Sequence, residues 1–210
     1  NFPDNFKYKM TIIEPLVRKY IYELNSSLKD VNKFNILIVG GSQGARVFDN
    51  NLKDSIVKIS KNNAIKIFQQ TSQKNISYLN DFYSKNNIEN KVFSFEKNFG
   101  NIIQQADLCI TRAGASTLAE LSVLNIPFIA VPLPTSKDNH QSKNANFYKN
   151  KDCCWIIEQD YFEEKIEEYL KDILEKKIDF LKKKENLKKL NFQNTWINVN
   201  QKILKSLNEN

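Results

Sequence analysis

Short apolar runs alternate with amphipathic helical patterns from about residue 34 to residue 158. The apolar runs predict strands over 34–39, 64–69, 91–95, 107–110, 127–131 and 153–157. Between them the pattern predicts helices at about 45–60, 75–86, 99–105, 115–124 and 139–150. Continuous apolar strands are typical of a parallel sheet that helices cover on both faces. The alternation therefore predicts an α/β fold with a doubly wound, Rossmann-like parallel sheet.

The two ends of the chain differ from this central part. Residues 1–30 contain Pro3 and Pro15 and predict an entry segment with a short amphipathic helix from Val17 to Leu28. Residues 31–160 form the predicted sheet domain, and residues 161–210 predict one or two charged carboxyl-terminal helices. The apolar residues of that tail, Trp196 among them, either pack on the sheet domain, which we favour, or cover a partner domain.

Size and charge narrow the class of protein. With 210 residues, 41% of them hydrophobic, the chain can bury one substantial core. The net charge is +7, but lysines are interleaved with Asn and Glu, which indicates a solvated surface, with attraction to acidic ligands or anionic lipid as the alternative. Nucleic-acid binding is disfavoured because no helix-turn-helix, ribonucleoprotein or zinc-finger pattern occurs.

Targeting and cysteine patterns give further expectations. No apolar run reaches the roughly 18 residues that span a bilayer, and no signal peptide is present. The chain begins at Asn1 without Met, which suggests a fragment of a longer protein. Cys109, Cys153 and Cys154 form no C-x-x-C pair, so we expect reduced thiols in a cytosolic protein. Neither a D-x-D motif nor a metal-ligand cluster occurs, so we expect no metal and no cofactor.

Two small-residue loops follow predicted strands. The first is Gly-Gly-Ser-Gln-Gly-Ala at 40–45, and the second is Arg-Ala-Gly-Ala-Ser-Thr at 112–117. Glycines allow sharp turns and close approach to an anion, and the N–H groups of a following helix attract phosphate. A tight turn without ligand also favours glycines, and Ser42 could equally be a helix N-cap. Two such loops suggest a ligand with a long polar body, such as a sugar nucleotide.

The second loop leads to Glu120, which has two interpretations. Thr117 and Glu120 have the spacing of a capping box, which is a purely structural role. Alternatively, a carboxylate near the end of a strand can accept both hydroxyls of a ribose. Arg112 in the same loop is either an anion ligand or a member of a surface ion pair.

The segment after Pro132-Leu133-Pro134 is rich in amide side chains. Asp138 and Gln141 also have capping-box spacing, but Gln and Asn suit recognition of sugar hydroxyls because they carry donors and an acceptor. His140 is the only histidine of the chain, and we expect it to be structural or a hydrogen-bond donor rather than a catalyst.

Three blocks in order carry a family resemblance: 40–45, 112–120 (Arg-Ala-Gly-Ala-Ser-Thr-Leu-Ala-Glu), and Asp-Asn-His-Gln at 138–141 with Asn144-Ala145. From about residue 14 to residue 158 the chain resembles the carboxyl-terminal domain of the MurG family of bacterial glycosyltransferases, glycosyltransferase family 28. The resemblance implies the donor-binding half of a GT-B enzyme. Such enzymes transfer N-acetylglucosamine (GlcNAc) from UDP-GlcNAc to lipid I, giving lipid II.

That resemblance carries further expectations. It implies a role in peptidoglycan biosynthesis, and so in cell wall biogenesis, cell shape and cell division, as a peripheral protein at the cytoplasmic face of the inner membrane. The lipid I site, the main membrane-facing patch and the catalytic base are expected on an absent amino-terminal half. We therefore expect no catalytic residue and no activity in this chain alone. Two alternatives remain: the soluble donor subunit of a split UDP-GlcNAc transferase, and a non-catalytic UDP-sugar-binding module.

The resemblance also assigns donor-binding roles by position. It places the diphosphate near Gly41, Ser42, Gln43, Gly44 and Arg18, although the proline before Arg18 is displaced by one residue from the family motif. It places the ribose at Glu120, the diphosphate and nucleoside along Ser116 and Thr117, and the GlcNAc hydroxyls at His140 and Gln141. Phe95 and Glu96 fall where the family has an aromatic residue followed by Ile to hold uracil, so Glu96 departs from the pattern.

Overall fold

The computed structural model describes residues 17–24, 32–41, 46–190 and 196–208. Within them lies a six-stranded sheet of order β3-β2-β1-β4-β5-β6, in which every neighbouring pair is parallel. The strands are β1 Phe34–Val39, β2 Ile65–Gln70, β3 Glu89–Phe93, β4 Leu108–Thr111, β5 Phe128–Ala130 and β6 Cys154–Ile156. Each overlaps a predicted strand, so the prediction of a doubly wound parallel sheet is confirmed.

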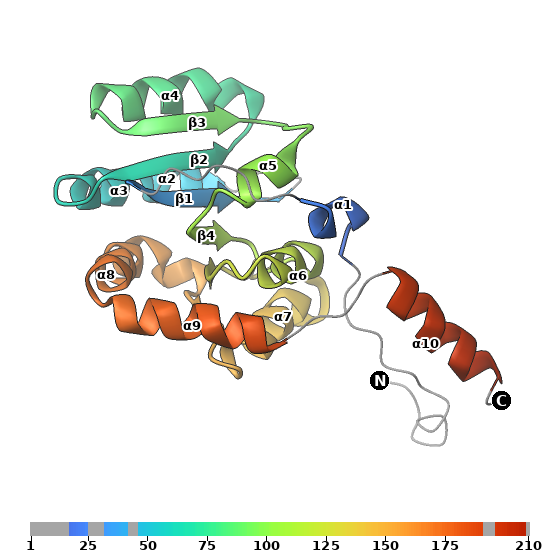
Figure 1. The fold of residues 1–210 in the computed structure, drawn as a ribbon. Coiled ribbons are helices and arrows are strands. Elements are labelled where there is room, and N and C mark those ends of the chain that lie inside the picture. Colours follow the sequence, from blue (N-terminus) through green and yellow to red (C-terminus); the bar gives the residue numbers. More distant parts are fainter. Residues whose placement is uncertain (1–16, 25–31, 42–45, 191–195, 209–210) are drawn as a thin grey trace.

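Helices cover both faces of the sheet (Figure 1). Their bounds are α1 Lys19–Tyr22, α2 Arg46–Asn51, α3 Lys53–Ser60, α4 Ile76–Lys85, α5 Phe99–Ile103, α6 Ala115–Val123, α7 His140–Lys149, α8 Phe162–Glu175, α9 Lys177–Leu190 and α10 Trp196–Asn208. Short 3₁₀ turns precede three of them: η2 Gln73–Asn75, η3 Lys137–Asn139 and η4 Gln159–Tyr161.

Alternating residues along the strands point to opposite faces of the sheet and pack in two separate apolar cores. In β1, Leu37 and Val39 pack in one core, and Ile36 and Ile38 pack in the other. Helices α1, α5, α6, α7 and α9 contribute to the first core, and α2, α3, α4 and α8 contribute to the second. Burial on both faces explains why the strands read as continuous apolar runs.

The strand order places a topological switch point between β1 and β4. From the central β1 the chain first adds β2 and β3 on one side, and then returns to add β4, β5 and β6 on the other. Val39 and Thr111, which end β1 and β4, are register partners, and the connections that follow them lead to α2 and α6 on opposite faces of the sheet. Ligands of open α/β sheets bind in the crevice at such a point.

Three predicted helical regions were wrong in detail. The helix expected from Val17 to Leu28 is only Lys19–Tyr22 in the described residues, and 25–28 lie outside them. The helix expected over 45–60 is divided at Leu52 into α2 and α3. The described residues of the tail form α8, α9 and α10 where one or two helices were expected. The non-helical backbone of Lys176 separates α8 from α9, and residues 191–195 lie outside the described residues.

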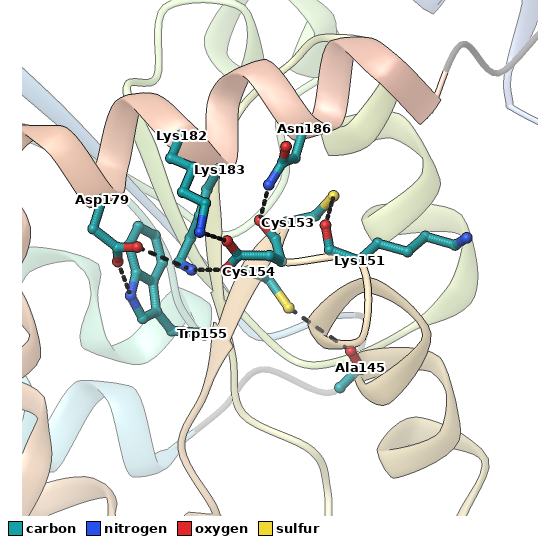
Figure 2. Close-up of polar contacts among 10 residues, drawn as sticks. Ala145, Lys151, Cys153, Cys154, Trp155, Asp179, Lys182, Lys183 and Asn186 are labelled. Atoms are coloured by element: carbon teal, nitrogen blue, oxygen red, sulfur yellow. Dashed lines mark hydrogen bonds and ion pairs between the residues drawn. The ribbon is translucent and has the colours of Figure 1, made fainter.

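A buried lysine fixes α9 against the start of β6. The ammonium of Lys183 lies 2.6 Å from Asp152 Oδ1 and 4.8 Å above the Trp155 ring. Figure 2 shows Lys182, Lys183 and Asn186 of α9 pointing toward the segment that leads into β6. Lys182 also contacts Asp152, and Asn186 donates to the Asp152 carbonyl at 3.0 Å. The packing of the tail on the sheet domain is therefore confirmed for α9.

Helix α10 differs from α8 and α9. Figure 1 shows it projecting from the sheet domain, and its exposed apolar side chains are Ile197, Ile203, Leu204 and Leu207. The side chain of Trp196 lies outside the described residues. None of the described helices combines the length and the apolar character that crossing a bilayer requires.

All three cysteines are free and buried, which confirms that they form no disulfide. Burial raises the pKa of Cys153 to about 11 and that of Cys154 to about 12, and it raises the pKa of Cys109 as well. The thiols therefore stay protonated near neutral pH and are poor nucleophiles.

Candidate functional site

Glu120 is a buried carboxylate in α6 whose partner comes from the far end of the chain. The residue is 1% exposed, and Arg18 donates to it from Nε to Oε1 at 2.5 Å and from Nη2 to Oε2 at 2.7 Å. Arg18 immediately precedes α1, and its guanidinium also lies 5.0 Å from the centre of the Tyr20 ring. The structure thus joins two residues that the sequence analysis assigned to the diphosphate and to the ribose.

The two members of this pair differ sharply in exposure. The side chain of Arg18 is 54% exposed, whereas that of Glu120 is 2% exposed. A buried carboxylate requires hydrogen-bond partners, and the planar guanidinium supplies two. The hydrogen bond to Glu120 raises the pKa of Arg18 above its usual value. Arg18 can therefore leave toward solvent, but Glu120 then needs a replacement donor.

The capping-box interpretation of Glu120 is wrong. Helix α6 has Gly114 as its N-cap and begins at Ala115, and among the described residues no side chain caps its backbone N–H groups. Glu120 consequently lies in the second turn, beyond the reach of the helix start. Its carboxylate is instead turned toward Arg18.

The start of α6 presents small residues beside this carboxylate. Ala115 and Ser116 are exposed and Thr117 is half-buried. A Cβ on Gly114 would meet no atom of the described residues within 4 Å, and its φ of −70° suits any residue. Neither packing nor backbone conformation therefore requires glycine here. Open space in front of free helix N–H groups is the arrangement that an anion can approach closely.

The first glycine loop is described only at its beginning. Gly41 has φ of +78°, which favours glycine over any residue with a Cβ. Arg112 N donates to Val39 O at 3.3 Å, so the beginnings of both loops are in contact. Ser42, Gln43 and Gly44 lie outside the described residues, and their assignment to the diphosphate stays a prediction.

Two side chains of α7 hold the peptide that leads into α6. Gln141 Oε1 accepts from the N–H groups of Ala113 at 3.2 Å and Leu133 at 3.0 Å. Asn144 Nδ2 donates to the Ala113 carbonyl at 3.0 Å. Both polar groups of Ala113 are thereby fixed. Asn144 belongs to the third motif, and its position in the sequence gives no sign that it contacts the second loop.

These contacts correct the sequence interpretation of Gln141. Asp138 and Gln141 form no capping box, because the N-cap of α7 is Asn139 and the Gln141 oxygen serves two other N–H groups. Within the described chain the Gln141 amide nitrogen has no hydrogen-bond acceptor. Gln141 can therefore donate to a sugar hydroxyl but has no free carbonyl to accept from one.

His140 supplies the complementary group. Its Nδ1 lies 2.7 Å from the carbonyl oxygen of Lys137, which can only accept, so Nδ1 carries the proton. In the neutral ring the exposed Nε2 is then an acceptor. The preceding Asp138 and Asn139 both have positive φ, at 52° and 53°, a strained backbone that sets where α7 begins.

Arg112 is turned into the protein. It donates to the carbonyl of Val131 at 3.2 Å and to Gln159 Oε1 at 2.5 Å, and it lies 5.5 Å from the centre of the Phe48 ring. Burial lowers its pKa. The interpretation as a surface ion pair is wrong, since carbonyl and amide oxygens occupy the guanidinium and no carboxylate contacts it within the described residues.

The connection from β3 to α5 carries the two residues assigned to uracil. Phe95 is 81% exposed, which leaves its ring free as a stacking surface. Glu96 pairs with Lys91 at 2.6 Å and accepts from Asn98 N at 3.1 Å, and chiefly the Lys91 hydrogen bond lowers its pKa. Glu96 is therefore held by β3, through Lys91, and by the backbone of its own loop.

This connection also contacts the segment that carries Arg18. A Cβ on Gly100 of α5 would lie 2.9 Å from both Leu24 Cδ2 and Tyr20 Cε2. Helix α5 and the α1 segment therefore pack without room for a methyl group. Separately, the described residues contain no group of three or more His, Cys, Asp or Glu side chains that could hold a metal ion.

Comparison with known proteins agrees with this geometry. Residues 35–198 match the Glycosyltransferase family 28 C-terminal domain. A relative from Pelagibacter ubique (strain HTCC1062) is 44% identical over 210 residues, which cover 100% of this chain and 59% of that protein. A relative from Rickettsia bellii (strain RML369-C) is 36% identical over 167 residues, which cover 76% of this chain and 47% of that protein. Both are named UDP-N-acetylglucosamine–N-acetylmuramyl-(pentapeptide) pyrophosphoryl-undecaprenol N-acetylglucosamine transferase.

Solved structures give the same result. The crystal structure of Acinetobacter baumannii MurG is similar with a TM-score of 0.67 and 26% identity, covering 77% of this chain and 46% of that one. A UDP-GlcNAc 2-epimerase from Neisseria meningitidis, at 14% identity and a TM-score of 0.59, covers 86% of this chain and 45% of that one and shares the fold alone. The chain spans about half the length of the relatives it matches. It belongs to glycosyltransferase family 28, as that family's carboxyl-terminal domain.

Proposed function

We propose that this chain is the UDP-GlcNAc-binding domain of an inverting glycosyltransferase that converts lipid I to lipid II in peptidoglycan biosynthesis. The names of its relatives support the reaction. The observation that carries the binding role is the buried carboxylate of Glu120, held by Arg18 beside the open start of α6 at the switch point of the sheet.

The donor spans the carboxyl edge of the sheet in this proposal. The ribose hydroxyls donate to Glu120, and the uracil stacks on the exposed ring of Phe95. The diphosphate lies against the first turn of α6, with Ser116 and Thr117, and against the glycine loop from Gly41 to Gly44. The GlcNAc hydroxyls meet the amide nitrogen of Gln141 and Nε2 of His140, one a donor and the other an acceptor.

Donor binding exchanges the partner of Glu120. Without donor, Arg18 fills the position that the ribose hydroxyls take when UDP-GlcNAc enters. The displaced guanidinium then meets the diphosphate, so that both buried and exposed charges stay paired in each state. The high exposure of Arg18 supports this exchange, because its side chain moves through solvent rather than through the core.

The transfer itself is a displacement at the anomeric carbon of GlcNAc. The acceptor hydroxyl of lipid I attacks that carbon, the bond to the β-phosphate oxygen breaks, and UDP leaves with its negative charge stabilised by the α6 amides and Arg18. The proton of the acceptor hydroxyl passes to a base that we place on an amino-terminal half. In this proposal that half also holds the lipid I site and the main contact with the anionic cytoplasmic face of the inner membrane.

The exposed apolar side of α10 supports a partner domain. Ile197, Leu204 and Leu207 are each more than half exposed. Such a row on one helix is costly in water unless another surface covers it. We propose that the amino-terminal half of the same enzyme covers it.

Lipid II synthesis tests the function. The 210-residue chain alone is expected to give no lipid II from UDP-GlcNAc and lipid I. Adding the separately expressed amino-terminal half of the Pelagibacter relative is expected to give turnover. Turnover by the chain alone would contradict the placement of the base. A chain that binds UDP-GlcNAc yet gives no product with that half would favour a non-catalytic module.

A further inference from the structure

Asp49 is a buried carboxylate that the proposed donor contacts leave unused. It lies in α2 and is 7% exposed. Gln69 Nε2 donates to its Oδ1 at 2.9 Å, while Thr71 Oγ1 and Asn75 Nδ2 donate to its Oδ2 at 2.6 and 2.9 Å. All three donors are neutral side chains. Because burial of a charge is costly, a carboxylate held this way depends on the geometry of every bond.

A fourth residue fixes the direction of this network. The hydroxyl of Tyr83, fully buried in α4, donates to Gln69 Oε1 at 2.6 Å. Burial, together with the nearby charge of Asp49, raises the pKa of Tyr83, so the phenol stays protonated and remains a donor. The Gln69 amide therefore turns its oxygen toward Tyr83 and its nitrogen toward Asp49.

The network joins α2 to the strand beside β1. Gln69 lies in β2, where it is the register partner of Ile38 in β1. Thr71 follows β2 directly, and Asn75 belongs to η2. Asp49 is thus held to the carboxyl end of the strand that neighbours β1.

The other side of α2 is held by packing. Phe48, next to Asp49, has its ring centre 5.3 Å from that of Phe162 and 5.5 Å from the Arg112 guanidinium carbon. Helix α2 is therefore anchored both to β2 and to the loop that leads into α6. In sequence, the chain reaches α2 directly from the glycine loop at 40–45.

We infer that Asp49 is a positioning residue for the donor diphosphate, which acts by fixing α2 as the downstream anchor of the glycine loop. This inference rests on the proposed function. It predicts a specific pattern, because the base and ribose contacts at Phe95 and Glu120 come from other elements. Loss of Asp49 should weaken binding of the phosphates and spare binding of the nucleoside.

The affinities of the full chain for UDP and for uridine separate these contributions. Titration calorimetry measures UDP binding, and chemical-shift titration measures uridine binding. Asp49→Ala is expected to weaken UDP binding about tenfold, as loss of one charge-assisted phosphate contact does, while uridine binding changes less than about twofold.

Asp49→Asn is the conservative rescue. The Gln69 amide can turn over, so that its oxygen accepts from the new amide and the Tyr83 hydroxyl accepts from its nitrogen. UDP affinity is then expected within about threefold of the unaltered chain. Thr71→Val removes one donor without changing the shape of the side chain, so it is expected to show a smaller loss for UDP only. It also covers the case in which Asp49→Ala does not fold.

Two results would overturn the inference. One is an equal loss of UDP and uridine affinity in Asp49→Ala and Thr71→Val, which would mean that the network only supports the fold. The other is a UDP affinity that stays within about twofold of that of the unaltered chain in both variants, which would mean that the network does not act on phosphate binding. Failure of the unaltered chain to bind UDP would contradict the proposed function itself, and is seen before any variant is made.

Discussion

Arg18 and Glu120, 102 residues apart in the chain, form a two-point ion pair through Nε at 2.5 Å and Nη2 at 2.7 Å. The pair links the segment that leads into the sheet domain to the second turn of α6. The carboxylate of Glu120 is buried, whereas the side chain of Arg18 is about half exposed to solvent. This asymmetry makes Arg18 the member that can be exchanged and Glu120 the fixed point of the site.

Removal of Arg18 should have opposite effects on two ligands. In Arg18→Ala nothing competes with the ribose for Glu120, so uridine is expected to bind about threefold more tightly. UDP loses the arginine contact, and the ratio of UDP affinity to uridine affinity is expected to fall about tenfold. Calorimetric and chemical-shift titrations measure the two. Lys19→Ala, an exposed neighbour, is the control and should change neither.

The same variant should lose stability. An unpaired Glu120 is left in the core, but Arg18 is half exposed, so we expect about 1 kcal/mol rather than the roughly 3–5 kcal/mol of a fully buried pair. Urea unfolding measures the change. Weaker uridine binding by a folded Arg18→Ala chain would show that Arg18 does not compete for Glu120.

Gly114→Ala should separate stability from binding. The added Cβ meets no atom of the described residues within 4 Å and φ is −70°, so the free energy of unfolding is expected to change by less than about 1 kcal/mol. UDP affinity is expected to fall about tenfold or more, because the methyl group fills the space where the diphosphate approaches the α6 amides. Unaltered UDP binding would remove the start of α6 from the site.

Gly100→Ala, in contrast to Gly114→Ala, introduces a methyl group at a crowded position. Its Cβ would lie 2.9 Å from Leu24 Cδ2 and Tyr20 Cε2, so these two side chains must shift. We expect a loss of about 1–3 kcal/mol in unfolding free energy, typical of overpacking. We also expect weaker UDP binding, because the displaced Tyr20 ring contacts the Arg18 guanidinium. A variant of full stability and full UDP affinity would show that α1 accommodates the methyl group.

Gln141→Glu should weaken only the contribution of the GlcNAc group to donor binding. The carboxylate oxygens still accept from Ala113 and Leu133, but the donor that faces the sugar is lost. The gain in affinity of UDP-GlcNAc over UDP is expected to fall about fivefold or more, the net worth of one hydrogen bond. Asn146→Asp adds the same charge to an exposed position of α7 and is the matched control. An unchanged gain in Gln141→Glu would place the sugar elsewhere.

Strand prediction was accurate where both faces of a strand are buried and was displaced by two residues at the edge strand β3. Apolar runs located β1 and β4 within a residue, because both faces of these strands are covered. The edge strand β3 begins two residues before the predicted start, since Glu89, Asn90 and Lys91 pair with β2 while one side faces solvent. A run of polar residues gives no apolar signal even when its backbone completes a ladder.

Motifs indicated a candidate site but not its internal contacts. The glycine loops and Glu120 could be placed at one edge because parallel strands end together. The pairing of Arg18 with Glu120, the hold of Gln141 and Asn144 on Ala113, and the inward turn of Arg112 depend on tertiary packing. Capping-box spacing was misleading at both helices, because Glu120 instead binds the Arg18 guanidinium and Gln141 binds the backbone N–H groups of Ala113 and Leu133.

Titration of UDP-GlcNAc into the full chain and into its Glu120→Ala and Glu120→Gln variants tests the site most directly. The unaltered chain is expected to bind, and both variants are expected to bind at least about thirtyfold more weakly, because the ribose hydroxyls lose a charged acceptor. Circular dichroism serves as the check that the variants are folded. Folded variants that bind UDP-GlcNAc as tightly as the unaltered chain would contradict the account.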